Sequence, residues 1–443
     1  MARQNIAETV KPCPRLEGEV ILPGDKSISH RAAIFNSLAW GKAEISNFAP
    51  GKDCLATVSC LRALGVEIRR GGSQNCPTLL VSGTGKDGLK DMVMLKEPAD
   101  VLNAENSGTT MRLLSGLLSS QPFLSIITGD ASLRSRPMGR LIEPLRRMGA
   151  EIFGRGKDSF APLVIKGREL HGIEFSLPIP SAQIKSAILV AGLFAQGKTI
   201  LYQPIPSRDH TERLFKHMGA ELKSDGNLIS LSPLINPLAA MSFRIPGDIS
   251  SAAYFLVAGA IHPNARIVIK DCGINPTRTG IIDVLLAMGA KLKMENERME
   301  VGEPLADIIV ESSELKGVEI GGDIIPRLID EIPVLAVAGC VARGKTGIRG
   351  AGELRVKESD RIATVSRELS RLGAKIEPLP DGMVIHGGKP LLGAEVDSHL
   401  DHRLAMSLAV AGLIAKGGTT INHAQVVQVS YPAFWPDLQN LAD

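Results

Sequence analysis

The segment RPMGRLIEPLRRMGAEI (residues 136–152) governs the interpretation of the whole chain, because variants of its last five residues, MGAEI, recur elsewhere in the sequence. Its first part is amphipathic at helical spacing, and its second glycine precedes a short apolar run. This order predicts a helix, a glycine that ends the helix, and then a strand. The pattern recurs as LGVEI, MGAEI, MGAEL, MGAKL and LGAKI, with glycines at Gly65, Gly149, Gly219, Gly289 and Gly373.

The spacing of these glycines indicates an internal repeat. They lie 84, 70, 70 and 84 residues apart, and a sixth would fall near position 443. A second pattern, an apolar helical run followed by a turn and a β-rich run, also occurs six times. Six units of two helices and several strands predict two domains of three units each. The non-periodic stretch 231–248 separates units three and four, and residues 1–23 are expected to be a strand that belongs with the later units.

Composition restricts the class of protein. The chain of 443 residues is 44% hydrophobic and 22% charged, the balance of a soluble globular protein of two domains. A net charge of +3 and 4% aromatic residues argue against nucleic-acid binding. The first residues have no apolar core typical of a signal peptide, and the apolar run 187–195 is too short for a membrane span. Six cysteines without a CxxC pair predict a reduced, cytoplasmic protein.

Two segments imitate a phosphate-binding loop. AGLFAQGKT (191–199) and AGCVARGKT (338–346) both satisfy the pattern GxxxxGK[ST]. That loop requires a strand before it and a helix after it, so that the helix N-terminus faces the phosphate. Here the expected order is helix first and strand afterwards, so we interpret both segments as turns.

Basic residues collect at the expected helix starts. Examples are GDKSISHR (24–31), NSGTTMR (106–112), PIPSAQIKS (178–186) and DSHLDHR (397–403). A cation is mildly unfavourable at a helix N-terminus, where the helix dipole is already positive, unless an anion is bound there. The repeated pattern therefore predicts helix ends that converge on an anionic ligand, with separate solvated caps as the alternative. Asp330, Glu331, Glu358 and Asp401 lie within the same set, either as salt-bridge partners or as general acids and bases.

Nine segments of the chain, in order, resemble the signature blocks of the 5-enolpyruvylshikimate-3-phosphate synthase family. The residues within these blocks resemble those of the bacterial subgroup called class II. The family's α/β fold is an inverse-domain arrangement in which each of two domains contains three βαβαββ units, with the active site in the cleft. The resemblance and the repeats together predict one domain from residues 1–23 and 244–443 and another from 24–243. The segments are GDKSISHR (24–31), NSGTTMR (106–112), GDASLRSRPMGRLIEPL (129–145), SAQIKSA (181–187), RDHTE (208–212), NPTRTG (275–280), IDEIPVLA (329–336), ELRVKESDR (353–361) and HLDHRLAM (399–406).

The resemblance implies a reaction. The family transfers the enolpyruvyl group of phosphoenolpyruvate to the 5-hydroxyl of shikimate 3-phosphate and releases phosphate through a tetrahedral ketal. It uses no metal and no organic cofactor, and its enzymes bind glyphosate in the phosphoenolpyruvate pocket. Both substrates are polyanions, which explains the basic helix starts. We expect a cytoplasmic monomer that binds neither nucleic acid nor membrane.

The resemblance also assigns roles to individual residues. Asp330 would handle the 5-hydroxyl proton, and Glu358 the methylene proton with help from Lys26. The residues expected to hold shikimate 3-phosphate are Lys26, Ser27, Arg31, Ser181, Ala182, Gln183, Arg208, Asp330 and Lys357. Those expected to hold phosphoenolpyruvate are Lys26, Gly108, Arg136, Gln183, Arg361 and Arg403, with the last two on its carboxylate.

The chain departs from the family pattern at two positions. Many members have a second serine where this chain has Ala182, and some have a lysine where it has Val429, three residues before Pro432. Two alternative functions remain at this point. A UDP-N-acetylglucosamine enolpyruvyl transferase would share the fold but carry a reactive cysteine, for which Cys76 is the nearest candidate. A non-catalytic anion-binding protein would keep the repeats and lose the acid and the base.

Overall fold

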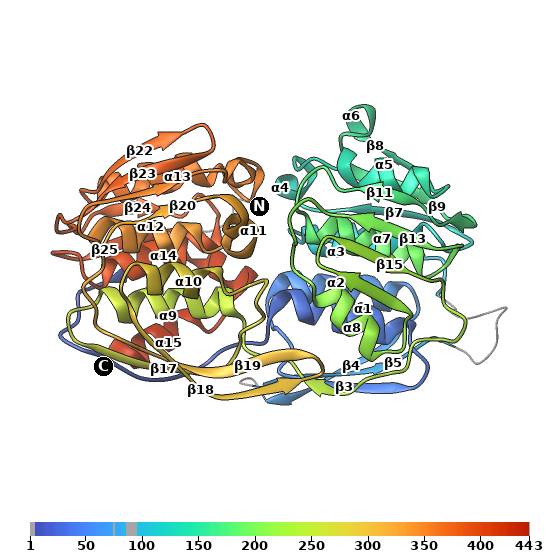
Figure 1. Cartoon of the computed structure of the whole chain (residues 1–443), viewed down its shortest axis with the longest axis horizontal. Helices are drawn as coiled ribbons and strands as arrows, with labels where there is room; N and C mark the ends of the chain where they lie inside the picture. The colour runs from blue at the N-terminus through green and yellow to red at the C-terminus, as the bar shows by residue number, and fades with distance from the viewer. Residues whose placement is uncertain (1–4, 74–75, 86–94, 443) are drawn as a thin grey trace. The chain divides into compact units, whose positions relative to one another are not determined.

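The computed structural model describes residues 5–73, 76–85 and 95–442 (Figure 1). The chain is a mixed α and β protein that divides into two compact units. We call Gly24–Ile245 with Met299–Glu303 the central unit, and Met1–Pro23, Pro246–Arg298 and Pro304–Asp443 the terminal unit. Each unit is described by itself.

The repeated glycines end helices, as the sequence predicts. Their φ angles lie between 86° and 100°, the left-handed region that a residue without a Cβ adopts readily. Each follows a helix by one or two residues and precedes a strand, so the chain reverses within a few residues. The five pairs are α2 (Lys52–Ala63) with β4 (Glu67–Ser73), α5 (Gly139–Arg147) with β8 (Glu151–Gly154), α8 (His210–His217) with β14 (Leu222–Asp225), α10 (Gly280–Ala287) with β18 (Lys291–Glu300), and α13 (Arg361–Arg371) with β22 (Lys375–Leu379).

The central unit contains three four-stranded sheets, in the orders β16-β3-β5-β4, β6-β7-β9-β8 and β11-β13-β15-β14. The sequence predicts three repeats in this part of the chain, and each of the three sheets corresponds to one repeat. Its further strands are β3 (Lys42–Ser46), β5 (Cys76–Ser82), β6 (Leu102–Asn103), β7 (Leu124–Thr128), β9 (Phe160–Lys166), β11 (Glu174–Ser176), β13 (Thr199–Tyr202), β15 (Leu228–Leu231) and β16 (Phe243–Arg244), and its further helices include α1 (Lys26–Leu38), α3 (Gly108–Leu118), α4 (Ala131–Arg134) and α7 (Ala182–Gly192).

The terminal unit has two four-stranded sheets, β18-β19-β17-β2 and β20-β21-β23-β22, and one three-stranded sheet, β1-β25-β24. Its further strands are β1 (Glu8–Val10), β2 (Leu16–Ile21), β17 (Ala265–Gly273), β19 (Glu303–Glu311), β20 (Glu319–Ile320), β21 (Lys345–Ile348), β23 (Gly382–His386), β24 (Glu395–Asp397) and β25 (Thr419–Asn422), and its further helices are α9 (Ile249–Ile261), α11 (Ile325–Leu328), α12 (Ile332–Val341), α14 (His402–Gly412) and α15 (Phe434–Ala442).

The two main crossings of the chain between the units, after Pro23 and after Ile245, fall between a strand and the helix that follows it, whereas Met299–Glu303 belongs to the turn region between β18 and β19. Strand β2 pairs in parallel with β17 of the terminal unit, although the next helix, α1, belongs to the central unit. Strand β16 likewise pairs in parallel with β3 of the central unit, although the next helix, α9, belongs to the terminal unit. Strand β2 is thus set in its sheet by a partner more than 200 residues away in sequence.

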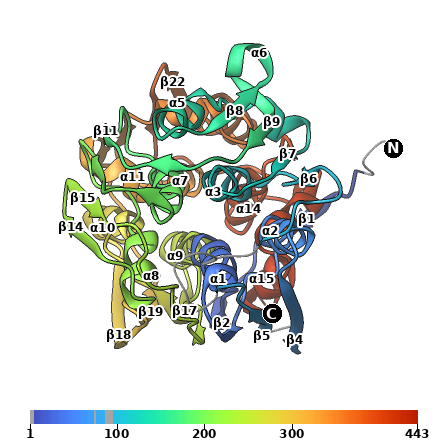
Figure 2. The same ribbon diagram turned by 90° about the vertical axis from the view of Figure 1, so that its right-hand side faces the viewer.

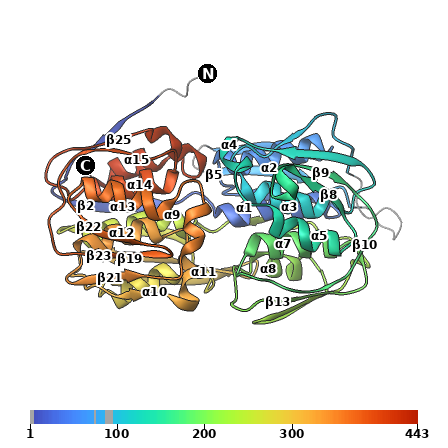
Figure 3. The same cartoon turned by 90° about the horizontal axis from the view of Figure 1, so that it is seen from above.

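Three helices form the interior of each unit. In the central unit α3 packs against α1 and α7, with the strands outside them (Figure 2). In the terminal unit α9, α12 and α14 pack against one another (Figure 3). These helices are buried on almost all sides, which explains why their sequences lack an exposed polar face, and the polar side chains that they do contain, such as Arg31 and Lys185, are themselves buried.

The two segments that imitate phosphate-binding loops are turns, as predicted. Helix α7 precedes β13, and helix α12 precedes β21, which is the reverse of the order that such a loop requires. None of the six cysteines, all of which lie in the described ranges, forms a disulfide. No helix within those ranges has both the length and the hydropathy of a membrane span.

The close approach of α3 and α7 yields a test of this packing. A Cβ on Gly116 of α3 would lie 2.2 Å from the backbone oxygen of Ala187 in α7, so Gly116→Ala must push the helices apart. Overpacking of this kind costs about 1–3 kcal/mol. Denaturant unfolding of Gly116→Ala and of Gly71→Ala measures the effect. A Cβ on Gly71 would meet nothing within 4 Å, and equal losses of stability in both proteins would contradict the packing.

Candidate active site

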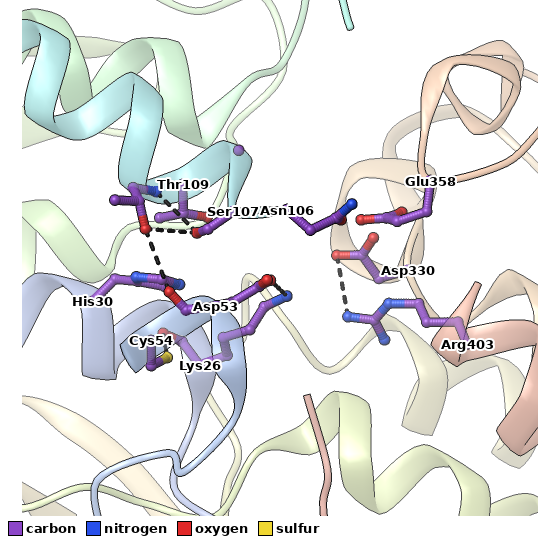
Figure 4. A network of polar contacts seen from close by, with 12 residues as sticks. Lys26, His30, Asp53, Cys54, Asn106, Ser107, Thr109, Asp330, Glu358 and Arg403 are labelled. Atoms are coloured by element: carbon purple, nitrogen blue, oxygen red, sulfur yellow. Dashed lines mark hydrogen bonds and ion pairs between the residues drawn. The ribbon is translucent and has the colours of Figure 1, made fainter. Parts of the chain in front are cut away.

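Lys26 is the first residue of α1, and two acidic residues fix its surroundings. Asp25 caps the helix by accepting from the backbone N–H of Ile28 at 2.9 Å. The Lys26 ammonium donates to Asp53 Oδ2 at 2.8 Å, and Asp53 comes from the first turn of α2 (Figure 4). A buried carboxylate at this distance keeps the ammonium charged and restricts its rotamers. Sequence reasoning missed Asp53, whose only signal was an acidic residue in the first turn of a predicted helix.

Gly108 opens α3 beside two guanidinium groups. A Cβ at this position would lie 2.4 Å from Arg112 Nη1 and 3.4 Å from Arg136 Nη1. Arg136 is buried and donates to the side-chain oxygen of Asn106 at 2.7 Å. The sequence led us to expect that bound substrate explains this glycine. The structure shows a further constraint, because the end of Arg112 already occupies the space that a methyl group would need.

Arg112 connects the start of α3 to the start of α7. It donates from Nη1 to Gln183 Oε1 at 2.8 Å, and Gln183 Nε2 donates to the hydroxyl of Thr109 at 2.9 Å. Ser181 caps α7, and Ala182 and Gln183 are its first two residues. The amide of Gln183 is therefore held in one orientation, with both its oxygen and its nitrogen engaged.

Arg31 is buried one turn into α1. It donates to Thr211 Oγ1 at 2.7 Å, to Ser186 Oγ at 2.6 Å and to the backbone oxygen of Ser27 at 2.9 Å. Burial lowers the pKa of Arg31 to about 10, although Glu212 counteracts this. Its contacts bind the backbone of Ser27 to α7 and α8, which fixes the position of Ser27.

Two further cations near α8 differ from each other. Arg208 is half-buried in the loop before α8. Lys185, which the helix-start pattern placed with the anion-binding cations, is fully buried and lies 2.7 Å from Glu212 Oε1. It forms an ion pair in the core of the unit, so the pattern overestimated the number of cations available to a ligand.

Arg361 is the most heavily engaged cation of the terminal unit. Its side chain is 1% exposed and donates to three carboxylates: Asp401 at 2.7 Å, Glu358 at 2.5 Å and Asp330 at 3.4 Å. Burial opposes its charge, but Asp401 and Glu358 hold the pKa of Arg361 above its ordinary range. Burial also raises the pKa of Asp401, but Arg361 outweighs this effect, and the pKa lies below the usual value.

Asp330 lies among three cations. Arg361 Nη1 is 3.4 Å from its Oδ1, and Lys357 Nζ is 3.9 Å from the same oxygen. Arg403 Nη2 is 3.7 Å from its Oδ2 (Figure 4). Burial disfavours the charge of Arg403, yet Asp330 and its neighbours raise the pKa of that guanidinium well above its ordinary value. Opposite charges at these distances favour the ionised carboxylate of Asp330.

The two residues that depart from the family pattern, Ala182 and Val429, lie at a helix start and against the hydrophobic core. Ala182 lies in the first turn of α7, where its backbone N–H is not used within the helix. Val429 is partly buried and packs against the hydrophobic core of the terminal unit. Among the described residues, no group of three or more His, Cys, Asp and Glu side chains is arranged to hold a metal ion.

Comparison with known proteins identifies relatives along almost the whole chain. The family model for "EPSP synthase (3-phosphoshikimate 1-carboxyvinyltransferase)" matches residues 10–438. A 3-phosphoshikimate 1-carboxyvinyltransferase of Herpetosiphon aurantiacus is 53% identical over 430 residues, 97% of each chain. One from Gloeobacter violaceus is 53% identical over 433 residues, 98% of each chain.

Solved structures agree with the sequence matches. The structure of EPSP synthase from Acinetobacter baumannii has a TM-score of 0.86 and 43% identity, and the match covers 99% of this chain and 98% of that one. The enolpyruvyl transferase NikO from Streptomyces tendae has a TM-score of 0.79 at 18% identity, covering 99% and 97%. The second likeness shows the fold alone.

The Arg361–Asp401 pair predicts how stability depends on pH. Asp401→Asn keeps the side-chain oxygen that caps α14 but removes the charge, and breaking a buried ion pair costs about 3–5 kcal/mol. Because the pKa of Asp401 is lowered by folding, its contribution is complete above the ordinary carboxyl pKa of about 3.9 and disappears as pH falls through the folded value.

We therefore expect a large stability difference between wild type and Asp401→Asn at pH 7 that shrinks below about pH 4. Unfolding free energies measured at several pH values check this, with Asp225→Asn, an exposed position, as the control. A difference that stayed constant at acid pH would show that the charge of Asp401 is unimportant.

Proposed function

Because the chain belongs to the EPSP synthase family, we propose that the two residue sets described above act together on one pair of substrates. The chain is an enolpyruvyl transferase that uses phosphoenolpyruvate and shikimate 3-phosphate in aromatic biosynthesis. The proposal concerns which residues bind, which move protons, and in what order. It also takes residues 1–23 with 244–443, and 24–243, as the two functional domains.

Shikimate 3-phosphate is assigned mainly to the starts of α1 and α7. Ser181, Ala182 and Gln183 present the N-terminal N–H groups of α7, which suit a phosphate, and Arg208 supplies a cation beside them. Lys26 and Ser27 contribute from α1, where Arg31 fixes the backbone of Ser27. Asp330 and Lys357 contribute from the terminal unit.

Phosphoenolpyruvate is assigned to the start of α3 and to three arginines. Gly108 lies beside the guanidinium groups of Arg112 and Arg136, and Arg112 contacts Gln183. Lys26 lies within reach of both substrates in this proposal. Arg361 and Arg403 take the carboxylate. Since Arg361 already contacts three carboxylates, a substrate carboxylate must displace Glu358 or Asp330 from it.

Asp330 is proposed as the base that accepts the 5-hydroxyl proton of shikimate 3-phosphate. The observation that supports this role is its position 3.4–3.9 Å from three cations, which keeps it ionised and able to accept a proton. The alkoxide oxygen then attacks the carbon of phosphoenolpyruvate that becomes cationic when the methylene group is protonated. The product of this addition is the tetrahedral ketal, which loses phosphate.

Glu358 is proposed to carry the methylene proton in both directions. Its contact with Arg361 favours the carboxylate, the form that removes a methyl proton during elimination. Addition requires the protonated form instead. When the substrate carboxylate occupies Arg361, Glu358 loses its main charge partner, and the positive Lys26 held by Asp53 assists the same transfer.

The proposal also covers the location, the oligomeric state and the partners of the protein. We place it in the cytoplasm as a monomer, without nucleic-acid or membrane partners, on the basis of its cysteine content and near-neutral net charge. The alternative of a UDP-sugar enolpyruvyl transferase is not favoured, because the relatives have a different name and Cys76 lies at the start of β5 in contact with Arg244.

Phosphate release with both substrates tests the acid and base assignments. Asp330→Asn and Glu358→Gln keep the side-chain size but remove the proton carrier, so kcat should fall by about 10²–10⁴. KM for phosphoenolpyruvate should stay the same or decrease, since each change removes an anion that competes for Arg361.

Glu353→Gln, on the same loop and exposed, is the control and should behave like wild type. Turnover within a few-fold of wild type in both variants would refute the assigned roles. Absence of phosphate release in the wild-type protein would refute the function itself.

Gly108→Ala tests the phosphoenolpyruvate site. The methyl group would meet Arg112 Nη1 at 2.4 Å, displacing Arg112 from Gln183 as well as narrowing the pocket. Loss of one hydrogen bond is worth about 0.5–1.5 kcal/mol, so KM for phosphoenolpyruvate should rise up to about tenfold while that for shikimate 3-phosphate changes little. Gly139→Ala is the matched control, because Gly139 also opens a helix but a Cβ there would meet nothing closer than 3.8 Å. Steady-state kinetics with unchanged constants in both variants would leave Gly108 a helix-start residue only.

A further inference from the structure

Four buried polar side chains form a continuous chain through the three helices α1, α2 and α3. His30 Nδ1 lies 2.7 Å from Thr57 Oγ1, which lies 2.6 Å from Thr110 Oγ1, which lies 2.7 Å from Ser107 Oγ. All four residues are at most 1% exposed. The chain begins in the core of the central unit and ends at the cap of α3, next to Gly108 (Figure 4).

The protons in this chain can point in only one direction. A threonine hydroxyl has one proton. Thr110 has two acceptors for it, Ser107 Oγ at 2.7 Å and the backbone oxygen of Asp53 at 3.4 Å, and the shorter contact makes Thr110 the donor to Ser107. Thr110 must then accept from Thr57, because its single proton is already used. Thr57 in turn has no proton left for His30, so His30 must donate from Nδ1.

A neutral His30 is consistent with this count. Burial lowers the pKa of His30 well below its ordinary value, and the nearby charges of Lys26 and Arg31 add to the effect. The ring therefore carries one proton, which the contact with Thr57 assigns to Nδ1. Its Nε2 is buried and has no hydrogen-bond partner within the described ranges, as expected for the unprotonated nitrogen.

Ser107 has an unused proton. Its oxygen accepts twice from Thr110, from the backbone N–H at 3.1 Å and from the hydroxyl at 2.7 Å. Over residues 5–73, 76–85 and 95–442, no group accepts the proton of Ser107. A buried donor without an acceptor is unfavourable, so we expect an acceptor that is not part of the protein, such as a bound ligand.

The surroundings of Ser107 indicate the chemistry of that acceptor. Asn106, on one side, orients the guanidinium of Arg136, and Gly108, on the other, opens α3 with its unused backbone N–H groups. The guanidinium that Asn106 orients, the Ser107 hydroxyl and the backbone N–H groups at the start of α3 are donors that suit an anion with several oxygens.

We propose that Ser107 is a further substrate-binding residue, whose hydroxyl donates to the phosphate of phosphoenolpyruvate, with its proton directed outward by the chain from His30. This inference rests on the proposed placement of phosphoenolpyruvate at the start of α3. An O–H donor to an anionic oxygen forms a short, strong hydrogen bond, and the chain fixes its direction before the substrate arrives. The simpler explanation is that Ser107 only caps α3.

Kinetics of Ser107→Ala and Ser107→Thr separate the two explanations. Loss of a hydrogen bond to a charged group should raise KM for phosphoenolpyruvate about tenfold or more in Ser107→Ala, with KM for shikimate 3-phosphate within about twofold. Ser107→Thr keeps both cap and donor and should restore the wild-type value. If Ser107→Ala does not fold, Ser107→Gly removes the same hydroxyl at a smaller cost to the helix cap.

A spectroscopic measurement tests the direction of the protons independently of kinetics. The ¹⁵N NMR signals of the His30 ring, assigned by comparison with His30→Gln, should show a neutral ring protonated at Nδ1. A ring protonated at Nε2 would reverse the chain and overturn the inference, as would unchanged phosphoenolpyruvate kinetics in Ser107→Ala.

Arg136→Met distinguishes a failure of this inference from a failure of the proposed site. If Arg136→Met raises KM for phosphoenolpyruvate and Ser107→Ala lowers only thermal stability, Ser107 is a cap and the inference is wrong. If neither variant changes that KM, phosphoenolpyruvate does not bind at α3, and the proposed site fails as well.

Discussion

The complete burial of three helices in each unit is the constraint on which the rest of the structure depends. Because α1, α3 and α7, like α9, α12 and α14, are covered on nearly all sides, their bodies are largely apolar. A polar side chain within them, such as Arg31 or Lys185, requires a buried partner, so the helix ends are the places left for ligand chemistry. Their first turns contain unused backbone N–H groups and attract anions. The residues assigned to substrates lie largely at these starts or in the loops before them, so the architecture itself selects an anion-binding protein.

The sequence predicts the repeat well because its signals are local. A helix, a left-handed glycine and a strand are encoded within about a dozen residues, and all five glycines adopt the predicted conformation. Contacts between helices are not local. Asp53 meets Lys26 from the next helix, and Arg112 meets Gln183 across 71 residues. No periodicity signals such partners, and for the same reason Lys185 was grouped with the ligand-binding cations although it pairs with Glu212 inside the core.

Most cations of the site have an acceptor within their own unit. Lys26 contacts Asp53, Arg136 contacts Asn106, and the guanidinium groups of the terminal unit contact Asp330, Glu358 and Asp401. These partners keep the cations charged and oriented while they are out of water, which prepares them for polyanionic substrates. The same partners compete with the substrate, so the gain on binding is an exchange of one anion for another rather than the neutralisation of a bare charge. In the proposed mechanism, proton transfer by Glu358 depends on that exchange, because Glu358 is a carboxylate that the incoming anion can displace from Arg361.

Some family members have a lysine at the position of Val429. Because this chain has none there, uncharged hydrogen-bond donors are more important for binding the anionic substrates. Val429 packs on the hydrophobic core, so no charge is available at that position to offset the repulsion between two polyanions. A hydroxyl or a backbone N–H can take over part of this task without the large desolvation penalty of another buried ammonium group. Such a donor is effective only if its proton already points at the anion, since a freely rotating hydroxyl loses entropy on binding. The ordered chain from His30 to Ser107 meets this condition with groups that keep their protonation near neutral pH, and it places that donor on the same helix start as Gly108.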